Sequence, residues 1–232
     1  MRLNFSEFFQ FSCVLCQSPL KLGANGLCSR CQRQIPRYTY CGRCGAPLQY
    51  VAGYCGNCYR HAFIWDRLVV IGRYDEPLSH LIHHFKFQKK FWLDRTLARL
   101  LLLELYEARR IYGLTFPQAI IPVPLHHLRQ WQRGYNQSDL LAKVLSRWLN
   151  IPCLSHIVKR VKNTPTQRGL SATARCRNLN NAFKITLSSP FPYKRIALVD
   201  DVITTGSTLN EIATLLRQLG VQEIQVWGLA RV

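Results

Sequence analysis

The sequence has few acidic residues and no long hydrophobic run. Only 12 Asp and Glu residues stand against 31 Lys and Arg residues, which gives a formal net charge of +19. No carboxylate side chain occurs between Glu7 and Asp66, and none between Asp139 and Asp200, a stretch with 11 Lys and Arg residues. No apolar run approaches the roughly 18 residues of a membrane span, which argues against a membrane-spanning protein. This large excess of positive charge, concentrated in two blocks, favours a polyanionic binding partner over a basic surface without a specific role.

A secretory signal is also missing, because residues 1–10 include Glu, Asn and Ser and hold no long apolar core. This absence argues against a secreted domain held by disulfides. The first 60 residues nevertheless carry eight cysteines in four Cys-x-x-Cys pairs, and a redox motif would normally occur once. Because tetrahedral zinc takes four thiolates, the pairs predict two structural Zn²⁺ sites. Neighbouring pairs are expected to share a metal, with Cys13, Cys16, Cys28 and Cys31 on one ion and Cys41, Cys44, Cys55 and Cys58 on the other. A cross-braced pairing stays open.

The segment 199–208, Val-Asp-Asp-Val-Ile-Thr-Thr-Gly-Ser-Thr, combines two acids with a small, hydroxyl-rich loop. It follows an apolar run that predicts a buried strand and precedes a run with helical spacing. Free N–H groups at a helix start favour a phosphate, and two adjacent carboxylates can accept hydrogen bonds from vicinal hydroxyls. An ordinary strand-to-helix turn with capping acids is the alternative, and the ordered run disfavours it. The pattern predicts a ribose 5-phosphate site made by Asp200, Asp201, Thr204, Thr205, Gly206, Ser207 and Thr208.

From residue 66 onward, apolar strand patterns alternate with helical ones. The expected strands are 67–73, 119–122, 157–161, 182–185, 196–199 and 223–230, and the expected helices are 77–85, 91–110, 136–149 and 209–219. Helix 136–149 is expected to turn Leu140, Leu141, Val144, Leu145 and Trp148 inward. This alternation predicts an α/β fold with a doubly wound, mainly parallel sheet. Ligands of such sheets bind at the carboxyl ends of strands, where the acid pair falls.

Two basic segments complete the candidate sites. Arg129 and Arg133 follow a Pro-Val-Pro strand exit and could grip a second phosphate group, such as a pyrophosphate, although a solvated loop explains them equally well. The polar segment 159–178 is punctuated by Pro and Gly and is expected to be a mobile loop that closes over an anion. Its cations are the candidates for nucleic-acid binding: Lys159, Arg160, Lys162, Arg168, Arg175 and Arg177.

The acid pair and the loop resemble the phosphoribosyl-pyrophosphate loop of type I phosphoribosyltransferases. The resemblance implies that Asp200 and Asp201 bind the ribose hydroxyls, that residues 204–208 wrap the 5-phosphate, and that Mg²⁺ bridges ribose and pyrophosphate oxygens. One departure is Thr204, which stands where some purine enzymes carry an acid. A Thr cannot act as a general base near neutral pH, so purine salvage is disfavoured.

Motifs along the whole chain resemble the ComF/GntX family. They are the paired cysteines, Phe85-Lys86-Phe87, Pro-Val-Pro, Arg-Gly-Tyr-Asn-Gln, Thr-Pro-x-Gln-x-x-Leu-Ser, Arg-x-Arg-Asn and the phosphoribosyl loop, in that order. The resemblance implies a double zinc ribbon over residues 1–62 and a phosphoribosyltransferase-like domain over 63–232. It also implies a factor for natural transformation that handles incoming single-stranded DNA.

The function expected from these observations is a cytoplasmic DNA-uptake factor with a phosphoribosyl-pyrophosphate site. It would bind single-stranded DNA and other DNA-uptake proteins, through which it could reach the inner face of the membrane. The alternative is an active phosphoribosyltransferase acting on a base or amine. The sequence leaves open whether any transfer is catalysed.

Overall fold

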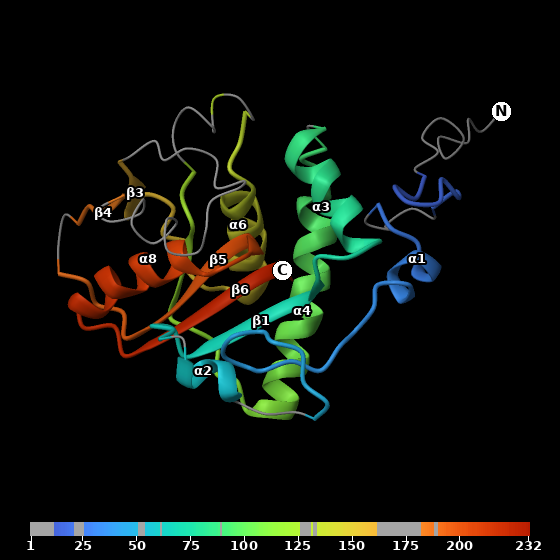
Figure 1. The fold of residues 1–232 in the computed structure, drawn as a ribbon. Coiled ribbons are helices and arrows are strands. Elements are labelled where there is room, and N and C mark those ends of the chain that lie inside the picture. Colours follow the sequence, from blue (N-terminus) through green and yellow to red (C-terminus); the bar gives the residue numbers. More distant parts are fainter. Residues whose placement is uncertain are drawn as a thin grey trace.

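A computed structural model describes most of the chain: residues 12–20, 26–50, 54–60, 62–88, 90–125, 131, 134–161, 182–187 and 190–232. At its centre is a four-stranded parallel sheet in the order β1-β6-β5-β2 (Figure 1). The strands are β1 (Arg67–Arg73), β2 (Ala119–Pro122), β5 (Arg195–Ile203) and β6 (Glu223–Arg231). This sheet confirms the predicted α/β class.

Helices cover both faces of the sheet, because alternate strand residues are apolar on both sides. One face packs against α3 (Leu78–Phe87), α4 (Leu93–Tyr112) and α6 (Gln137–Leu149), and the other against α8 (Ser207–Gln218) (Figure 1). Neighbouring residues of β5 show the alternation, since Val199 lies in the first core and Leu198 in the second. The fold is therefore doubly wound, as the sequence predicts.

The remaining strands, β3 (Val158–Arg160) and β4 (Phe183–Ile185), form a separate antiparallel pair. The pair is attached to α8, because the Glu211 carboxylate accepts hydrogen bonds from the backbone N–H groups of Ala182 and Phe183. Both segments were expected as strands, and the structure adds that they lie outside the main sheet.

Local capping signals explain where the helices begin and end. The Asn136 side chain accepts a hydrogen bond from the Ser138 N–H and so caps the start of α6. Gly113 ends α4 with a φ of +64°, a conformation that glycine adopts without steric cost. The expectation for Trp148 is wrong: its side chain is 42% exposed, because the buried face of α6 runs through Leu141, Val144 and Leu145.

The cysteine-rich segments pack directly on this framework. Helix α1 (Ser29–Arg33) belongs to the first segment, whose Cys13 and Cys31 share a core with α3 and α4. Helix α2 (Gly56–Arg60) belongs to the second, whose Cys41 and Cys44 share the opposite core with α8. The two segments thus lie against different faces of the sheet. Across the described part of the chain, no helix is both long enough and apolar enough to cross a membrane.

Candidate ribose-phosphate site and zinc centres

The acid pair lies near the carboxyl end of β5, and the strand continues through it to Ile203. The sequence suggested that the strand ends at Val199, but β6 pairs with β5 beyond that point, with Asp200 opposite Gly228 and Ile203 opposite Arg231. Strand pairing therefore fixes the backbone of both acids. A rigid strand end is a better platform for ligand groups than a free loop.

Each carboxylate has its own partner from a neighbouring helix. Asp200 Oδ1 accepts hydrogen bonds from Ser138 Oγ of α6 at 3.1 Å and from the Asp201 N–H at 2.8 Å. Asp201 Oδ1 lies 2.9 Å from Lys86 Nζ of α3, and these two side chains are only 13% and 15% exposed. The site thus joins three elements that are far apart in the sequence.

The electrostatics of the pair favour a bound cation. Burial and, after it, the negative charge of Asp201 raise the pKa of Asp200 from 3.8 to about 7, although Lys86 and the hydrogen bonds act in the opposite direction. A single lysine therefore does not offset the cost of two adjacent carboxylates. A strongly shifted carboxyl group at the edge of an α/β sheet is typical of a functional site.

The phosphate-loop candidate is the turn from β5 into α8. Gly206 has a φ of +77°, and a Cβ there would lie 2.4 Å from Cη2 of the buried Trp65. Thr205 Oγ1 and Ser207 Oγ are 2.8 Å apart, so the hydroxyls gather at the first turn of α8. The structure brings this loop and the acid pair together on one continuous segment, with Thr204 exposed and Gly206 buried.

Four residues of this site were not assigned a role from the sequence: Lys86, Ser138, Trp65 and Arg231. Two sequence signals point to the first two, the Phe-Lys-Phe motif and the Asn-Gln-Ser start of α6. Arg231 donates hydrogen bonds to the carbonyl oxygens of Ile203 and Thr204. No local pattern could have found Arg231 or Trp65, because the hydrogen bonds of the one and the packing of the other join segments that are distant in the sequence.

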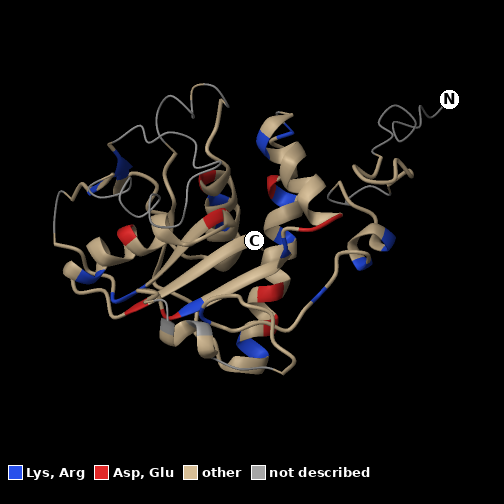
Figure 2. Cartoon of the chain, viewed as in Figure 1, with Lys and Arg blue, Asp and Glu red and all other residues tan. Residues whose placement is uncertain are grey.

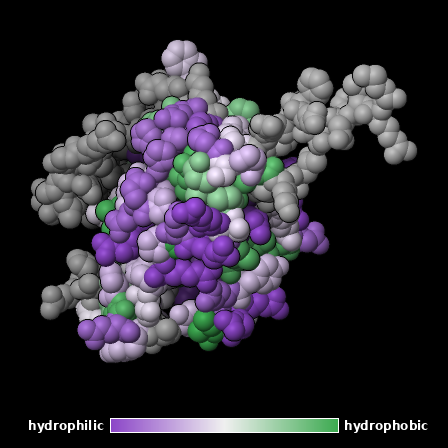
Figure 3. All heavy atoms as spheres, turned by 90° about the vertical axis from the view of Figure 1, so that its right-hand side faces the viewer, coloured by the Kyte–Doolittle hydropathy of each residue, from purple (hydrophilic) through white to green (hydrophobic). Residues whose placement is uncertain are grey.

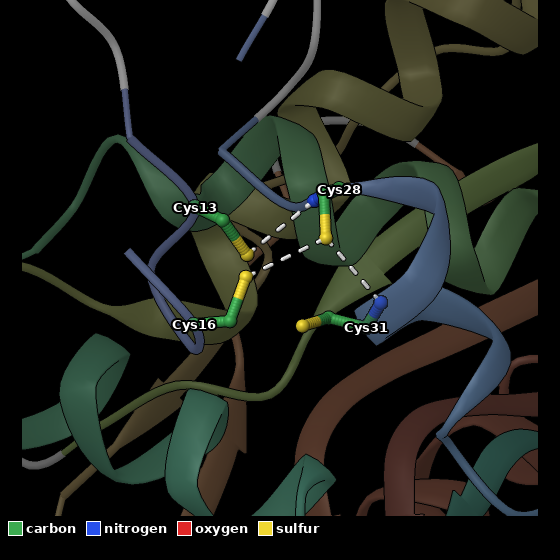
Figure 4. Close-up of side chains that lie close together, drawn as sticks. All are labelled: Cys13, Cys16, Cys28 and Cys31. Carbon is green, nitrogen blue, oxygen red and sulfur yellow. Dashed lines mark hydrogen bonds between the residues drawn. The ribbon is translucent and has the colours of Figure 1, made fainter. Parts of the chain in front are cut away.

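The first cysteine cluster (Cys13, Cys16, Cys28 and Cys31) has its ligand atoms within 4.8 Å of one another (Figure 4). The Cys16 and Cys28 sulfur atoms are 3.7 Å apart. A tetrahedral zinc ion with Zn–S distances of about 2.3 Å needs sulfur atoms roughly 3.8 Å apart. Backbone N–H groups of Cys28 and Cys31 donate to the sulfur atoms of Cys13 and Cys28, both at 3.4 Å. The donor set fits structural zinc.

The second cysteine cluster (Cys41, Cys44, Cys55 and Cys58) has the same arrangement. Its sulfur–sulfur distances are 3.6 Å for Cys41–Cys58, 3.4 Å for Cys44–Cys55 and 4.0 Å for Cys55–Cys58. Burial raises the pKa of the Cys44 and Cys58 thiols, so charged thiolates here need a cation. The structure groups the cysteines in sequential pairs, and the two clusters are consistent with two structural zinc ions.

Several candidate anion-binding residues lie outside the described residues: Arg129, Arg133, Lys162, Arg168, Arg175 and Arg177. Of the nucleic-acid candidates, Lys159 and Arg160 are described, and both belong to β3. Lys159 is exposed and stands directly opposite the exposed Lys184 of β4. The Arg160 guanidinium lies 5.5 Å from the ring centroid of Phe183. Among the described elements, Figure 2 shows the cations spread around the molecule.

A cavity of about 380 Å³ lies apart from the acid pair, between the segment after α1, β1 and α4. Its lining includes Arg33, Arg37, Leu100 and Glu104, and Arg37 is ion-paired with Glu104 at 3.3 Å. The side of the molecule that carries α1 shows apolar side chains among hydrophilic ones (Figure 3). Neither the acid pair nor the loop lines this cavity.

Comparisons with known proteins agree with this architecture. A family profile described as "Double zinc ribbon domain" matches residues 8–59, and one described as "Phosphoribosyl transferase domain" matches residues 137–231. A purine phosphoribosyltransferase from Pyrococcus horikoshii is 25% identical, with 58% of this chain and 72% of that chain covered. Its TM-score of 0.36 is too low to support a statement about this chain.

Full-length relatives give the decisive comparison. Competence protein F of Haemophilus influenzae is 63% identical over 226 residues, which cover 97% of this chain and 99% of that protein. DNA utilization protein YhgH of Escherichia coli K12 is 47% identical over 220 residues, 94% and 96% of the two chains. Competence protein ComFC of Bacillus subtilis is 26% identical over 206 residues, 84% and 79%. The chain therefore belongs to the competence protein F family, the ComF/GntX family that its motifs resemble.

Proposed function

We propose that this protein is a DNA-uptake factor that handles incoming single-stranded DNA and carries a binding site for phosphoribosyl pyrophosphate or a related ribose phosphate. The DNA role is supported by relatives named for competence and for DNA utilization. Cysteine-based zinc centres suit a reducing compartment, which supports action in the cytoplasm. Other DNA-uptake proteins are the expected partners.

The observation that carries the ligand proposal is the acid pair beside the glycine turn. In the proposal, Asp200 and Asp201 accept hydrogen bonds from the ribose hydroxyls, while residues 204–208 and the start of α8 surround the 5-phosphate. Arg129 and Arg133 are proposed to contact the pyrophosphate. The raised pKa of Asp200 suits a site that gains from a cation, and Mg²⁺ would supply that charge when it is bound with the ligand.

The DNA proposal rests on exposed positive charge on the β3–β4 pair, which is attached to α8, the helix that follows the loop. Lys159 and Lys184 face each other across the β3–β4 pair, and like charges at directly opposite positions destabilise a strand pair. A phosphate backbone would relieve that repulsion. The β3–β4 pair is attached to α8 through Glu211, so the DNA surface would lie beside this helix.

This surface predicts binding that tolerates any sequence and weakens strongly with salt. Each phosphate neutralised on a single strand contributes about −0.7 to the slope of log affinity against log salt, so several contacts give a slope steeper than about −2. Replacing Lys159, Arg160 and Lys162 together by Gln should flatten the slope and weaken binding to all sequences alike. If these cations serve only the pyrophosphate, the triple variant would lose phosphoribosyl pyrophosphate and keep DNA.

An active phosphoribosyltransferase is the second candidate function. The observation that favours it is the Asp200 pKa of about 7, which suits a group that exchanges protons near neutral pH. Thr204, at the place of an acid in some purine enzymes, speaks against purine transfer. Pyrophosphate release in the presence of bases or amines would support the enzyme.

The test titrates the zinc-loaded chain with phosphoribosyl pyrophosphate and Mg²⁺, with labelled single-stranded DNA, and with both together. The uptake-factor proposal predicts that both ligands bind and that no pyrophosphate is released. Turnover with an acceptor and a flat salt dependence of DNA binding would favour the enzyme.

A further inference from the structure

Arg231, at the end of β6, joins the second cysteine cluster to residues 203–208, which we call the ribose-phosphate loop. Its Nε donates to the carbonyl oxygen of Cys44 at 2.9 Å. Its Nη1 donates to the carbonyl oxygen of Ile203 at 3.1 Å and to that of Thr204. One planar guanidinium therefore holds the backbone of a zinc-ligand residue and the start of the loop at the same time. A lysine has no such fork and cannot reproduce this geometry.

A second connection runs through Arg43, which lies between Cys41 and Cys44 in the sequence. The Arg43 side chain donates to the carbonyl oxygens of Trp65 at 3.1 Å and Phe63 at 2.7 Å. The Trp65 indole N–H donates back to the Arg43 carbonyl oxygen at 2.7 Å. The Trp65 ring is fully buried and closes against Gly206, where a Cβ would meet it at 2.4 Å. The glycine turn of the loop thus rests on a ring that the cluster fixes.

The shape of the cluster depends on its metal. The four sulfur atoms lie within 4.8 Å of one another, which fits one metal ion, and a metal bound by all four would tie the Cys41–Cys44 turn to the Cys55–Cys58 turn. Loss of the metal would release the Cys44 carbonyl and the Arg43 backbone together. Both connections to the loop would then loosen.

The first cysteine cluster offers a matched control within the same chain. It packs in the core on the other face of the sheet, together with α3 and α4. Gly26, beside this cluster, lies against Trp92 at the start of α4. Loss of the first cluster should destabilise the core that it shares with α3 and α4. It should not act on the loop through Arg231 or Trp65.

We propose that the second cysteine cluster acts as a metal-dependent support for the ribose-phosphate loop, with Arg231 and Trp65 as positioning residues. Metal at this cluster then sets how ordered the loop is and how tightly it holds a ribose phosphate. The affinity part of this proposal rests on the function proposed above. The ordering of the loop does not, and it can be measured without any ligand.

The test compares amide hydrogen exchange of the loop in zinc-loaded full-length chains. Cys44→Ser removes a ligand of the second cluster, and Cys16→Ser removes one of the first. We expect loop amides at 203–208 to exchange at least tenfold faster in Cys44→Ser and at the wild-type rate in Cys16→Ser. Arg231→Gln keeps all eight cysteines, so it should retain both metals and still show the faster loop. Arg231→Lys should restore wild-type protection only in part.

Titration with phosphoribosyl pyrophosphate and Mg²⁺ adds a second readout, with at least a tenfold weaker affinity expected for Arg231→Gln. Loop amides that exchange at the wild-type rate in Arg231→Gln would overturn the proposal. If Cys44→Ser does not fold, Arg231→Gln is the variant that decides. Equal loosening by Cys16→Ser would also overturn it, because the effect would then be general. If the loop loosens as expected but no chain binds the ligand, the proposed function fails and the support role stands.

Discussion

Replacing Asp200 by Asn should make the protein more stable at neutral and alkaline pH. In the folded chain, burial and the neighbouring Asp201 charge raise the pKa of Asp200 from 3.8 to about 7. The unfolded chain therefore releases this proton at lower pH than the folded chain does. Stability must then fall as the pH rises from about 4 to about 7, because the folded state binds more protons across that window.

The size of the effect follows from the shift. At about 1.4 kcal/mol per pKa unit, the change from 3.8 to about 7 sets an upper limit of about 4 kcal/mol. Because the two carboxylates interact, we expect Asp200→Asn to gain only about 1–2 kcal/mol at pH 8. The gain should be full above about pH 7, shrink as the pH falls, and vanish below about pH 4. Asn keeps an oxygen that can accept from Ser138.

Urea unfolding of zinc-loaded protein between pH 5.5 and 8.5 measures the difference between Asp200→Asn and wild type. The matched control is Asp75→Asn, since the Asp75 side chain is 61% exposed and pairs only at the surface with Arg73. The control should change stability little at any pH. A destabilised Asp200→Asn chain, or a gain that does not depend on pH, would refute the electrostatic account of this site.

Three further predictions concern the zinc centres and the loop. Metal analysis should find about two zinc ions per chain, and Cys28→Ser should leave about one and lower the melting temperature; a wild-type chain without zinc would contradict this. Gly206→Ala should cost about 2–4 kcal/mol in a thermal unfolding assay, because it combines positive φ with a clash against Trp65; an unchanged melting temperature would argue against that packing. Lys86→Met removes the cation beside Asp201 and should raise the pKa of Asp200 further, because Lys86 lowers it in the wild type. Carboxyl NMR titration measures this change, and an unchanged Asp200 titration would contradict the role of Lys86.

The sequence predicts those features that depend on local spacing. Two-residue spacers identify the thiolate pairs, because a metal knuckle needs that spacing whatever surrounds it. Alternating apolar patterns predict the strands and helices, and the Asp-Asp loop predicts a site at the carboxyl end of β5. The position of this site follows from the rule that ligands of parallel α/β sheets bind at the carboxyl ends of the strands.

Features that depend on contacts between distant segments could not be predicted this way. Lys86 meets Asp201 across more than a hundred residues, and Trp65 meets Gly206 across a longer stretch still. Trp148 was expected inside because its spacing fits the apolar stripe, yet the buried face of α6 leaves it exposed. Periodicity describes one helix, while the packed neighbours decide which part of its stripe is covered.

The central claim is that the acid pair and its loop bind a ribose phosphate. Calorimetric titration of the zinc-loaded chain with phosphoribosyl pyrophosphate and Mg²⁺ tests it most directly, with the double variant Asp200→Ala/Asp201→Ala beside it. Each lost hydrogen bond to a charged group is worth about 1–3 kcal/mol, so the account predicts saturable binding by wild type and at least a tenfold loss in the variant. No binding to wild type, or equal dissociation constants for the two chains, would contradict it.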